Sequence, residues 1–506
     1  MSTAKRVIKN TGFLYAKVGI TMFISLYTTR LILNSLGAND FGIFSIVGGT
    51  IAMLGFLNAS MAGATQRFMS YSEGEGDKEK KKRIFNISTI LHFFIAIILG
   101  FVLLACGHFF FNGILNIQPD RVNAAKVIYG SLILSTMFTV MTVPYDAVLN
   151  SRENMLYYAI VGIIESLLKL AVAVAVVYTS GDKLITYGVL MAIIPLINML
   201  FMRVYCHRKY EECVIAPLKY WDKGLMKDMS GFAGWNFLTS ATTMITMQGS
   251  AILMNVFFGV IANAAHAIAN QLAGQVMVFS NNLLKALNPN IVKSEGANKR
   301  ESMIRFTIIG SKMSFVLLAL FAIPLCIKMP FFLSIWLKNP PEYAILFCRL
   351  VLIRLMITQF HVPLATAIGA GGKIRLQSTL ISIIAIAVLP VTALLYFIKW
   401  PVETIYFVFI AMTVLYLFVN TYFMKIKYGL ELSYFFSRVV LSCLLISVAT
   451  LSLGFFLSSF LDNDLLGFFS VSLVCMTFLS MLFYLFVLDE KEKHTLLNTL
   501  KKIINK

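Results

Sequence analysis

The chain has 506 residues, of which 58% are hydrophobic and 13% are charged, and its mean hydropathy is +0.80. One soluble core of this size does not need so much apolar surface, so these values exclude a soluble enzyme and indicate a protein that crosses a membrane many times. Most of the net charge of +19 comes from predicted loops. We therefore do not interpret the basic composition as nucleic-acid binding.

A transmembrane helix needs about 20 mostly apolar residues. Fourteen such segments follow one another, so we expect an all-α polytopic membrane protein with about 14 transmembrane helices. The longest predicted connections, near 64–85, 206–228 and 288–305, are too short for a soluble domain. In chain order the segments are 12–36, 41–63, 86–110, 122–149, 155–178, 184–205, 229–254, 260–287, 306–328, 342–368, 376–398, 402–424, 434–458 and 465–488.

Lysine and arginine are unevenly divided between the two sets of predicted loops. If the N-terminus is cytoplasmic, 31 of the 43 lie on the cytoplasmic side and six on the other. Cytoplasmic loops retain positive charge, so we predict a multi-pass protein of the cytoplasmic (inner) membrane with both termini in the cytoplasm. The seven cysteines form no CxxC pair, and we expect no disulfide framework, no metal site and no cofactor.

Two halves of the chain match at an offset of 222 residues. Gly37 falls on Gly259, and Ser72-Glu73-Gly74 falls on Ser294-Glu295-Gly296. Six helices in each half give both halves the same orientation, which is the plan of several secondary transporters with substrate held between two lobes. We predict a first lobe at 1–205, a cytoplasmic linker at 206–228, a second lobe at 229–424, and two further helices with a basic tail at 425–506.

Six cations fall inside predicted membrane helices, where an uncompensated charge costs several kcal/mol. We interpret five of them, together with His361, as a cationic cavity for an anionic substrate. Lys17 and Arg30 are equally consistent with anchors that reach opposite membrane surfaces. The six predicted cavity residues are Lys17, Arg30, Lys312, Arg349, Arg354 and His361.

Arg354 is the strongest of these candidates, because it falls at the centre of its helix, where its side chain cannot easily reach water. Thr358 and His361 continue the same helix face. A hydrogen-bonding role between helices is the alternative.

The sixth intramembrane cation, Lys169, is spaced i,i+4 from Glu165, and this spacing favours a structural ion pair. Asp146 is the second intramembrane carboxylate. These three residues are our candidates for ion coupling. The sequence has no GxxxxGK[ST] motif, so we do not expect direct use of ATP.

Two predicted helices, 229–254 and 260–287, carry uncharged polar residues at helical spacing. We interpret them as a polar cavity wall suited to sugar hydroxyls; hydrogen bonds between packed helices are the alternative. The wall residues are Asn236, Thr243, Asn263, His266 and Asn270.

The runs TRLILNSLGANDFGIFSIVGGTIAMLGFLNASMAGATQRFMSYSEGEGD (29–77) and VPYDAVLNSRENMLYYAIVGIIESLLKL (143–170) resemble the polysaccharide-biosynthesis flippases of the multidrug/oligosaccharidyl-lipid/polysaccharide exporter superfamily. The resemblance implies two six-helix lobes around a V-shaped cavity that opens alternately to each side and receives a polyprenyl-diphosphate-linked glycan. The individual cavity cations are inferred from their depth and charge and are not carried over from a family motif.

We therefore expect a flippase rather than an enzyme, one that moves an anionic lipid-linked oligosaccharide for O-antigen or capsular polysaccharide export by alternating access. Expected partners are this substrate, membrane lipids, and a polysaccharide polymerase and chain-length regulator. One alternative is a cation-coupled multidrug or metabolite antiporter of the same superfamily, which would need carboxylates in its cavity. Another is a membrane glycosyltransferase or polymerase, suggested by Asp462-Asn463-Asp464, which we interpret as a turn.

Overall fold

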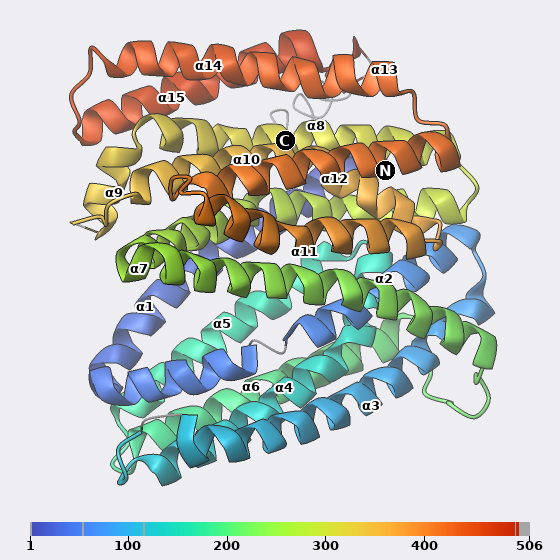
Figure 1. Ribbon diagram of the computed structural model, residues 1–506. Coiled ribbons are helices and arrows are strands. Elements are labelled where there is room, and N and C mark those ends of the chain that lie inside the picture. Colours follow the sequence, from blue (N-terminus) through green and yellow to red (C-terminus); the bar gives the residue numbers. More distant parts are fainter. Residues whose placement is uncertain (1–2, 53–54, 115–116, 338, 491, 495–506) are drawn as a thin grey trace, which may run out of the picture. The chain divides into compact units, whose positions relative to one another are not determined.

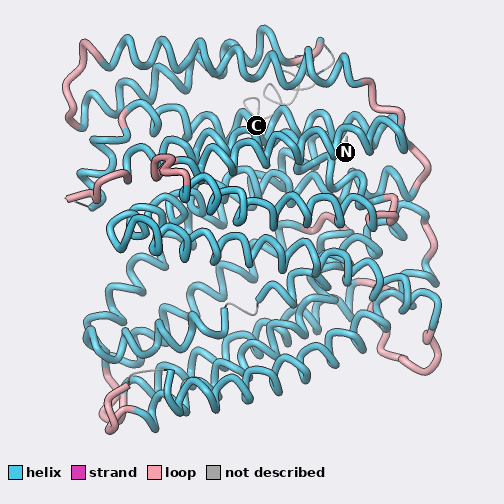
Figure 2. Tube along the Cα trace, viewed as in Figure 1, coloured by secondary structure: helices cyan, strands magenta, loops and turns pink. Residues whose placement is uncertain are grey.

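The computed structural model describes residues 3–52, 55–114, 117–337, 339–490 and 492–494. Within these residues every regular element is a helix and there is no strand (Figures 1 and 2). Twelve helices are long and apolar enough to cross a membrane. The predicted all-α, polytopic fold is confirmed for this part of the chain.

The first half of the chain forms six long helices. They are α1 (Thr3–Ala52), α2 (Gly55–Glu75), α3 (Lys78–Phe109), α4 (Val122–Ser151), α5 (Met155–Val177) and α6 (Lys183–Lys209), with a π-helical turn η1 (Phe110–Ile114) after α3.

The second half repeats this order and adds two helices at its end. Its members are α7 (Lys223–Gly296), α8 (Arg300–Ile327), α9 (Met329–Leu337), α10 (Ala344–Ala370), α11 (Arg375–Phe397) and α12 (Thr404–Tyr428). One further helix consists of α13 (Leu432–Tyr434), η2 (Phe435–Leu441) and α14 (Ser442–Ser458), and the other of α15 (Leu465–Leu482) and η3 (Phe483–Val487). We call these last two the C-terminal helix pair.

Two glycines divide the longest helices. Gly37 in α1 has φ 76° and ψ 169°, and Gly259 in α7 has φ 77° and ψ −170°. Residues with a side chain rarely adopt this φ, so glycine at both positions allows the chain to leave one helix and begin the next. Counting the parts on either side of each glycine agrees with the prediction of about 14 helices.

The backbone repeats with the offset of 222 residues that the sequence predicts. Gly37 and Gly259 obey it, and so do Gly76 and Asn298, which have φ of 77° and 57°. The first residues of α3 and α8 are 222 apart, as are those of α4 and α10. The internal match is therefore a repeat of structure.

The expected long connections near 64–85 and 288–305 are wrong, because helices occupy most of both. Helix α2 continues to Glu75, and α3 begins at Lys78. Asp77 caps α3, because its carboxylate accepts a hydrogen bond from the Lys80 N–H at 2.9 Å. Glutamate, lysine and arginine favour helix, so polar composition ended the membrane span without ending the helix.

The chain divides into two compact units. The first lobe is Ile8–Phe237, and the second lobe is Met1–Val7 with Leu238–Lys506. In the first lobe α4 packs against α2, α3 and α6; in the second, its repeat equivalent α10 packs against α8 and α12. The C-terminal helix pair packs side by side and against α8 (Figure 1).

The positive φ of the two dividing glycines can be tested directly. We expect Gly37→Ala and Gly259→Ala each to lower the free energy of unfolding by about 1–2 kcal/mol, because an alanine side chain disfavours this conformation. Gly231→Ala is the matched control: Gly231 lies within α7, and no atom lies within 4 Å of its added Cβ. Thermal unfolding of the purified protein checks this, and equal melting temperatures for all three variants would contradict it.

Candidate functional site

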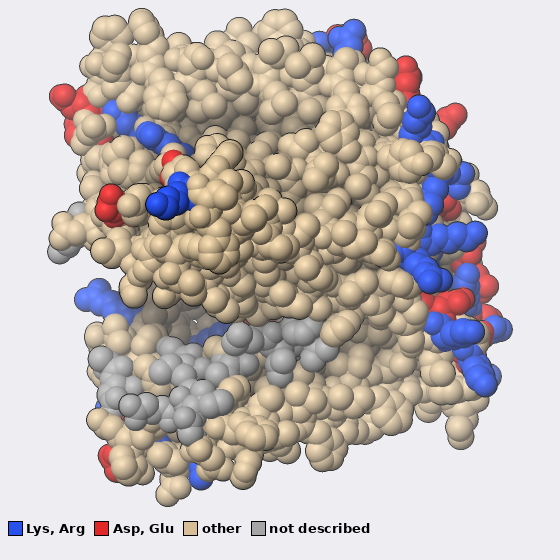
Figure 3. Space-filling model, viewed as in Figure 1, with Lys and Arg blue, Asp and Glu red and all other residues tan. Residues whose placement is uncertain are grey.

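The face of the protein in Figure 3 is largely uncharged, and its lysines and arginines gather toward the helix ends. Charged side chains along the helices are therefore exceptions. They occur in both lobes, and each lobe is described by itself.

A polar cluster of the first lobe lies on one face of α5. Tyr158, Gly162, Glu165 and Lys169 follow one another at helical spacing. Lys169 Nζ donates to Glu165 Oε1 at 2.6 Å, as their spacing predicts. Lys17 of α1 lies across the same face, and its Nζ is 4.4 Å from the centroid of the Tyr158 ring.

Gly162 makes room for this arrangement. A Cβ at this position would overlap Cε of Lys17. Asp146 of α4 and Glu165 both interact electrostatically with Tyr158. The first-lobe cluster thus consists of two ammonium groups, two carboxylates and a phenol: Lys17, Asp146, Tyr158, Glu165 and Lys169. The structure brings all three predicted ion-coupling residues together with Lys17.

Arg30 does not join this cluster. It lies on α1, 13 residues or about 20 Å beyond Lys17, and its side chain is exposed. Its exposed neighbours on the helix include Phe23, Leu26 and Tyr27.

Arg354 lies near the middle of α10 in the second lobe. Its guanidinium lies over the ring of Phe409, 4.9 Å from the centroid, and interacts electrostatically with Tyr406 and Tyr416. Among the described residues its guanidinium has no ion pair and no hydrogen bond within the chain. A half-buried guanidinium with five donors and no acceptor from the described residues is suited to an anion or to water.

His266 is the centre of a hydrogen-bonded group beside Arg354. Its Nδ1 is 2.8 Å from the hydroxyl of Tyr406, and its Nε2 is 3.0 Å from Nδ2 of Asn270 and 3.4 Å from Oγ of Ser250. The imidazole is buried. These contacts hold one ring between α7 and α12.

His361 lies two turns beyond Arg354 on α10. Its ring packs edge-on against Tyr416 with centroids 5.6 Å apart. Its Nδ1 is buried without a hydrogen-bond partner in the part of the chain that the structure describes. His361, Arg354, His266, Tyr406 and Tyr416 form the second-lobe cluster.

The predicted polar wall divides into separate roles. Thr246 of α7 donates to the backbone carbonyl of Ala385 in α11 at 2.9 Å, so it joins two packed helices. Thr243 is exposed and donates to its own helix, at the carbonyl of Thr239. Asn263 is half-buried. Asn236 falls in the first lobe, where a Cβ on Gly63 would lie 3.6 Å from its Nδ2.

Lys312 of α8 and Lys328, which directly follows α8, attach the C-terminal helix pair. Lys312 is fully buried, and its Nζ lies 3.1 Å from Glu492 and 3.4 Å from Asp489. Lys328, at the other end of the helix, donates to the carbonyls of Leu461 and Asp462 at 3.1 and 3.2 Å and to Asn463 at 3.1 Å. Carboxylates after α15 thus compensate the charge that we assigned to a cavity.

Arg349 also has a partner on α8. Its Nε donates at 2.9 Å to the carbonyl of Cys326. In a continuing α-helix this carbonyl would accept a hydrogen bond from the N–H of residue 330, but residue 330 is a proline and has no N–H. The guanidinium lies 6.0 Å from the ring of Phe455 in α14. This arginine satisfies a carbonyl that proline leaves open, and we leave Lys312 and Arg349 out of the substrate path proposed below.

The predicted turn at Asp462-Asn463-Asp464 is confirmed. Asp464 caps α15 by accepting a hydrogen bond from the Gly467 N–H at 2.6 Å, and the carbonyl of Asp462 accepts from Lys328. This segment links α14 to α15.

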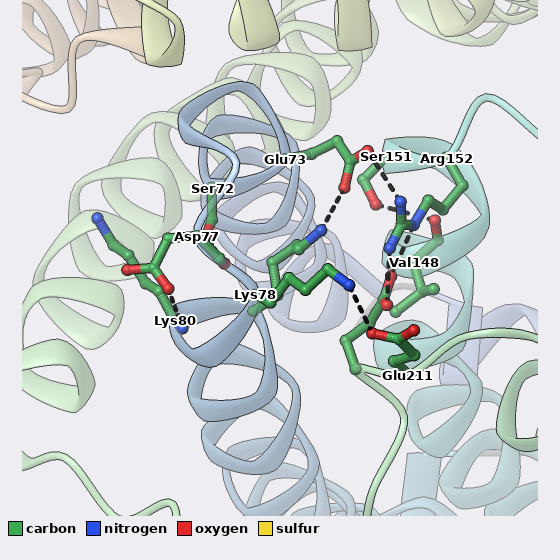
Figure 4. Close-up of polar contacts among 11 residues, drawn as sticks. Ser72, Glu73, Asp77, Lys78, Lys80, Val148, Ser151, Arg152 and Glu211 are labelled. Carbon is green, nitrogen blue, oxygen red and sulfur yellow. Dashed lines mark hydrogen bonds and ion pairs between the residues drawn. The ribbon is translucent and has the colours of Figure 1, made fainter.

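Sequence reasoning missed an ion-pair network at one end of the first lobe, because we had counted its lysines and arginines as topology signals. Arg152 donates to both carboxylate oxygens of Glu212 at 2.8 Å and to Glu73 at 3.0 Å, and Lys81 donates to the other oxygen of Glu73 at 2.8 Å. In Figure 4 Arg152 points toward Glu73, and the neighbouring Lys78 toward Glu211.

This network joins the two segments on which the resemblance rests. Glu73 lies near the end of the run 29–77, and Arg152 lies in the run 143–170. That each of the two resembling segments contains one of these oppositely charged residues is the sequence signal that could have predicted the contact between Glu73 and Arg152. Burial opposes ionisation of Glu212, but the hydrogen bonds from Arg152 and from the Glu212 backbone, together with the charges of Arg152 and Lys81, lower the pKa of Glu212 below its ordinary value. The network therefore ties the linker that follows α6 to the rest of the first lobe.

A second network lies at the opposite end of α4. Arg121 donates to both carboxylate oxygens of Asp40 and to Asp182 at 2.8 Å. Asp182 also caps α6 through the Leu184 and Ile185 N–H groups. Asp40 thus connects the part of α1 that follows Gly37 to α4 and α6.

Residues 18–175 match the family model MatE. This match covers most of the first lobe and less than half of the chain. No curated protein matches the sequence.

Solved structures match most of the chain. A MATE structure in the bent conformation superposes with a TM-score of 0.74 at 13% identity, covering 85% of this chain and 96% of that one. An outward-facing multidrug resistance MATE family transporter of the MOP superfamily gives 0.72 at 13% identity, with coverage of 85% and 96%. A MOP superfamily transporter from Pyrococcus furiosus Vc1 (DSM3638), in which reverse polarity of the binding pocket suggests a different function, gives 0.69 at 14% identity, with coverage of 86% and 97%.

At these identities the likeness shows the fold, which is the MATE transporter fold with two lobes. This agrees with the prediction that the protein is not an enzyme.

The Arg152–Glu212 contact gives a prediction with a neighbouring control. We expect Glu212→Gln to lower the free energy of unfolding by about 2–3 kcal/mol, because Glu212 is buried and the change weakens a bidentate pair. Glu211→Gln is the control: the Glu211 side chain is 73% exposed, and we expect no measurable change. Thermal unfolding and protease cleavage within 210–222 measure both.

The same contact predicts a pH dependence. Since the pKa of Glu212 is lowered by folding, its contribution is present above the unfolded pKa and is lost as pH falls through the folded one. Acid should therefore promote cleavage of the linker in the wild type more than in Glu212→Gln. An identical pH profile for both would contradict the role of this ion pair.

Proposed function

We propose that the protein is a cation-coupled antiporter of the MOP superfamily that exports an organic compound by alternating access of its two lobes. The first-lobe cluster carries this proposal. Two carboxylates, two lysines and a tyrosine lie together within membrane helices, and a change in their protonation changes the net charge of the site. The MATE fold and the MatE match support a transporter, and among the structural neighbours is a multidrug resistance protein.

In this mechanism a proton is the coupling ion. Glu165 is bonded to Lys169, Lys17 lies over Tyr158, and Asp146 acts on the same phenol. A proton taken up by one carboxylate leaves a lysine uncompensated, which favours repacking of α1 against α5. Proton uptake by the first lobe would then accompany release of the substrate from the second.

The second lobe narrows the class of substrate. The offset of 222 residues places Leu132 opposite Arg354, and the offset of 220 between α5 and α11 places Ala385 opposite Glu165, so the two lobes differ in charge at equivalent positions. The cationic Arg354 disfavours a cationic compound close to it, and we propose a neutral, zwitterionic or anionic substrate. The protein would lie in the cytoplasmic membrane with both termini in the cytoplasm.

A lipid-linked oligosaccharide flippase is the second candidate, and Arg354 is the observation that favours it. A guanidinium without an acceptor from the described residues suits a diphosphate. Arg30, which is exposed on α1, would contact the same diphosphate at another stage of its movement across the membrane. A polysaccharide polymerase and a chain-length regulator would then be its partners.

Proton coupling can be measured in proteoliposomes that contain the pH-sensitive dye pyranine. We add in turn ethidium as a cation, norfloxacin as a zwitterion and carboxyfluorescein as an anion. We expect norfloxacin or carboxyfluorescein to cause proton movement, and Glu165→Gln to reduce its rate at least tenfold, because the carboxylate that exchanges the proton is lost.

Two glycine variants provide a matched comparison without change of charge. Gly162→Ala displaces Lys17 from Tyr158 and should slow proton movement, whereas Gly130→Ala, where no atom lies within 4 Å of the added Cβ, should not. Proton movement with none of the three compounds, or an unchanged rate in Glu165→Gln, would reject the antiporter.

The flippase predicts a different phenotype. In the strain that carries this protein, Arg354→Ala should remove a surface glycan while the protein still reaches the membrane, because the diphosphate loses its counter-charge. Lys399→Ala, a charge in the α11–α12 connection, is the control. Normal surface glycan after deletion of the whole protein would exclude this candidate.

A further inference from the structure

A cavity of about 370 Å³ lies in the second lobe between the first turns of α8, the start of the C-terminal helix pair at α13, and the residues that follow the pair. Its lining residues are Glu301, Ile304, Arg305, Ile308, Tyr434, Asp489 and Glu492. The four from α8 lie on one helix face, and Lys312 continues that face one turn deeper. The cavity is therefore a slot along α8, close to the ion pairs that hold the helix pair in place.

The deep side of this slot is a fixed polar structure. Glu492 is bonded to the backbone of Asp489, whose N–H donates to Glu492 Oε2 at 2.9 Å. Asp489 Oδ2 accepts from Tyr434 at 2.8 Å and from Lys312 at 3.4 Å, and Glu492 Oε2 accepts from Lys312 at 3.1 Å. One oxygen of each carboxylate is thus occupied.

The remaining polar groups of the slot include both negatively and positively charged side chains. Among the described residues no hydrogen bond uses Asp489 Oδ1, Glu492 Oε1, the Glu301 carboxylate or the Arg305 guanidinium. Carboxylates accept hydrogen bonds from a primary ammonium, and arginine donates to phosphate. Ile304 and Ile308 provide an apolar wall between them.

We infer that this slot binds the headgroup of a phospholipid that carries a primary amine, such as phosphatidylethanolamine. The ammonium contacts the free oxygens of Glu301, Asp489 and Glu492, the phosphate contacts Arg305, and the glycerol and first methylenes lie against the two isoleucines. The slot begins at the first turn of a membrane helix, the level at which headgroups lie. The lipid then bridges α8 and the C-terminal helix pair. This inference does not depend on the proposed transport activity.

The test is thermal unfolding of the full-length protein in detergent, with one lipid added at a time. We expect phosphatidylethanolamine to raise the melting temperature by about 3 °C or more, because a ligand that binds the folded state stabilises it. Phosphatidylcholine, whose ammonium has no N–H, phosphatidylglycerol, which has no amine, and soluble glycerophosphoethanolamine should each give less than half of this shift.

Variants of the slot locate the effect. Glu301→Gln combined with Arg305→Gln changes two exposed side chains, and Ile308→Trp fills the slot; we expect each to reduce the phosphatidylethanolamine shift at least threefold. Glu490→Gln is the control, because this carboxylate is 89% exposed, pairs with Lys493 and does not line the slot. An equal shift with phosphatidylcholine, phosphatidylglycerol or the soluble headgroup, or a full shift in the Glu301/Arg305 variant, would overturn the inference.

Discussion

A charged side chain inside a bilayer is stable only where another group compensates it, and this constraint determines how the intramembrane cations are used. Lys312 is compensated by two carboxylates from beyond α15, and Lys169 by Glu165 on its own helix. Arg349 satisfies a backbone carbonyl. Arg354 lies over an aromatic ring among phenols, and a ligand or water must supply its acceptors. Residues of one chemical type thus have three different roles.

The attachment of the C-terminal helix pair follows from the same constraint. Lipid tails are as apolar as leucine, so there is little hydrophobic force that draws one membrane helix to another. Polar contacts at both ends of the pair supply the specificity instead: Lys328 binds the turn between α14 and α15, and Lys312 binds the chain after α15. The helix pair is therefore anchored at two points to α8, a helix of the internal repeat.

The two lobes share a backbone plan and differ in chemistry. The paired glycines and the starts of α3 and α4 keep an offset of 222 residues from their equivalents in the second half. The carboxylates of the first-lobe cluster and the guanidinium of the second fall at positions where the other half has an apolar residue. A repeat that retains its backbone while its charges diverge can assign the coupling ion to one lobe and the organic substrate to the other, which is the division that we propose.

The sequence by itself determined the all-α membrane fold, the repeat and the Glu165–Lys169 pair, because hydropathy, a fixed offset and an i,i+4 spacing are properties of the chain order. It also singled out Arg354, since depth within one helix can be read from that helix alone. Tertiary structure decided what the other cations do. The partners of Lys312 and Arg152 lie 177 and 60 residues away along the chain, and only the folded arrangement of helices brings those carboxylates within reach of the charge that they neutralise.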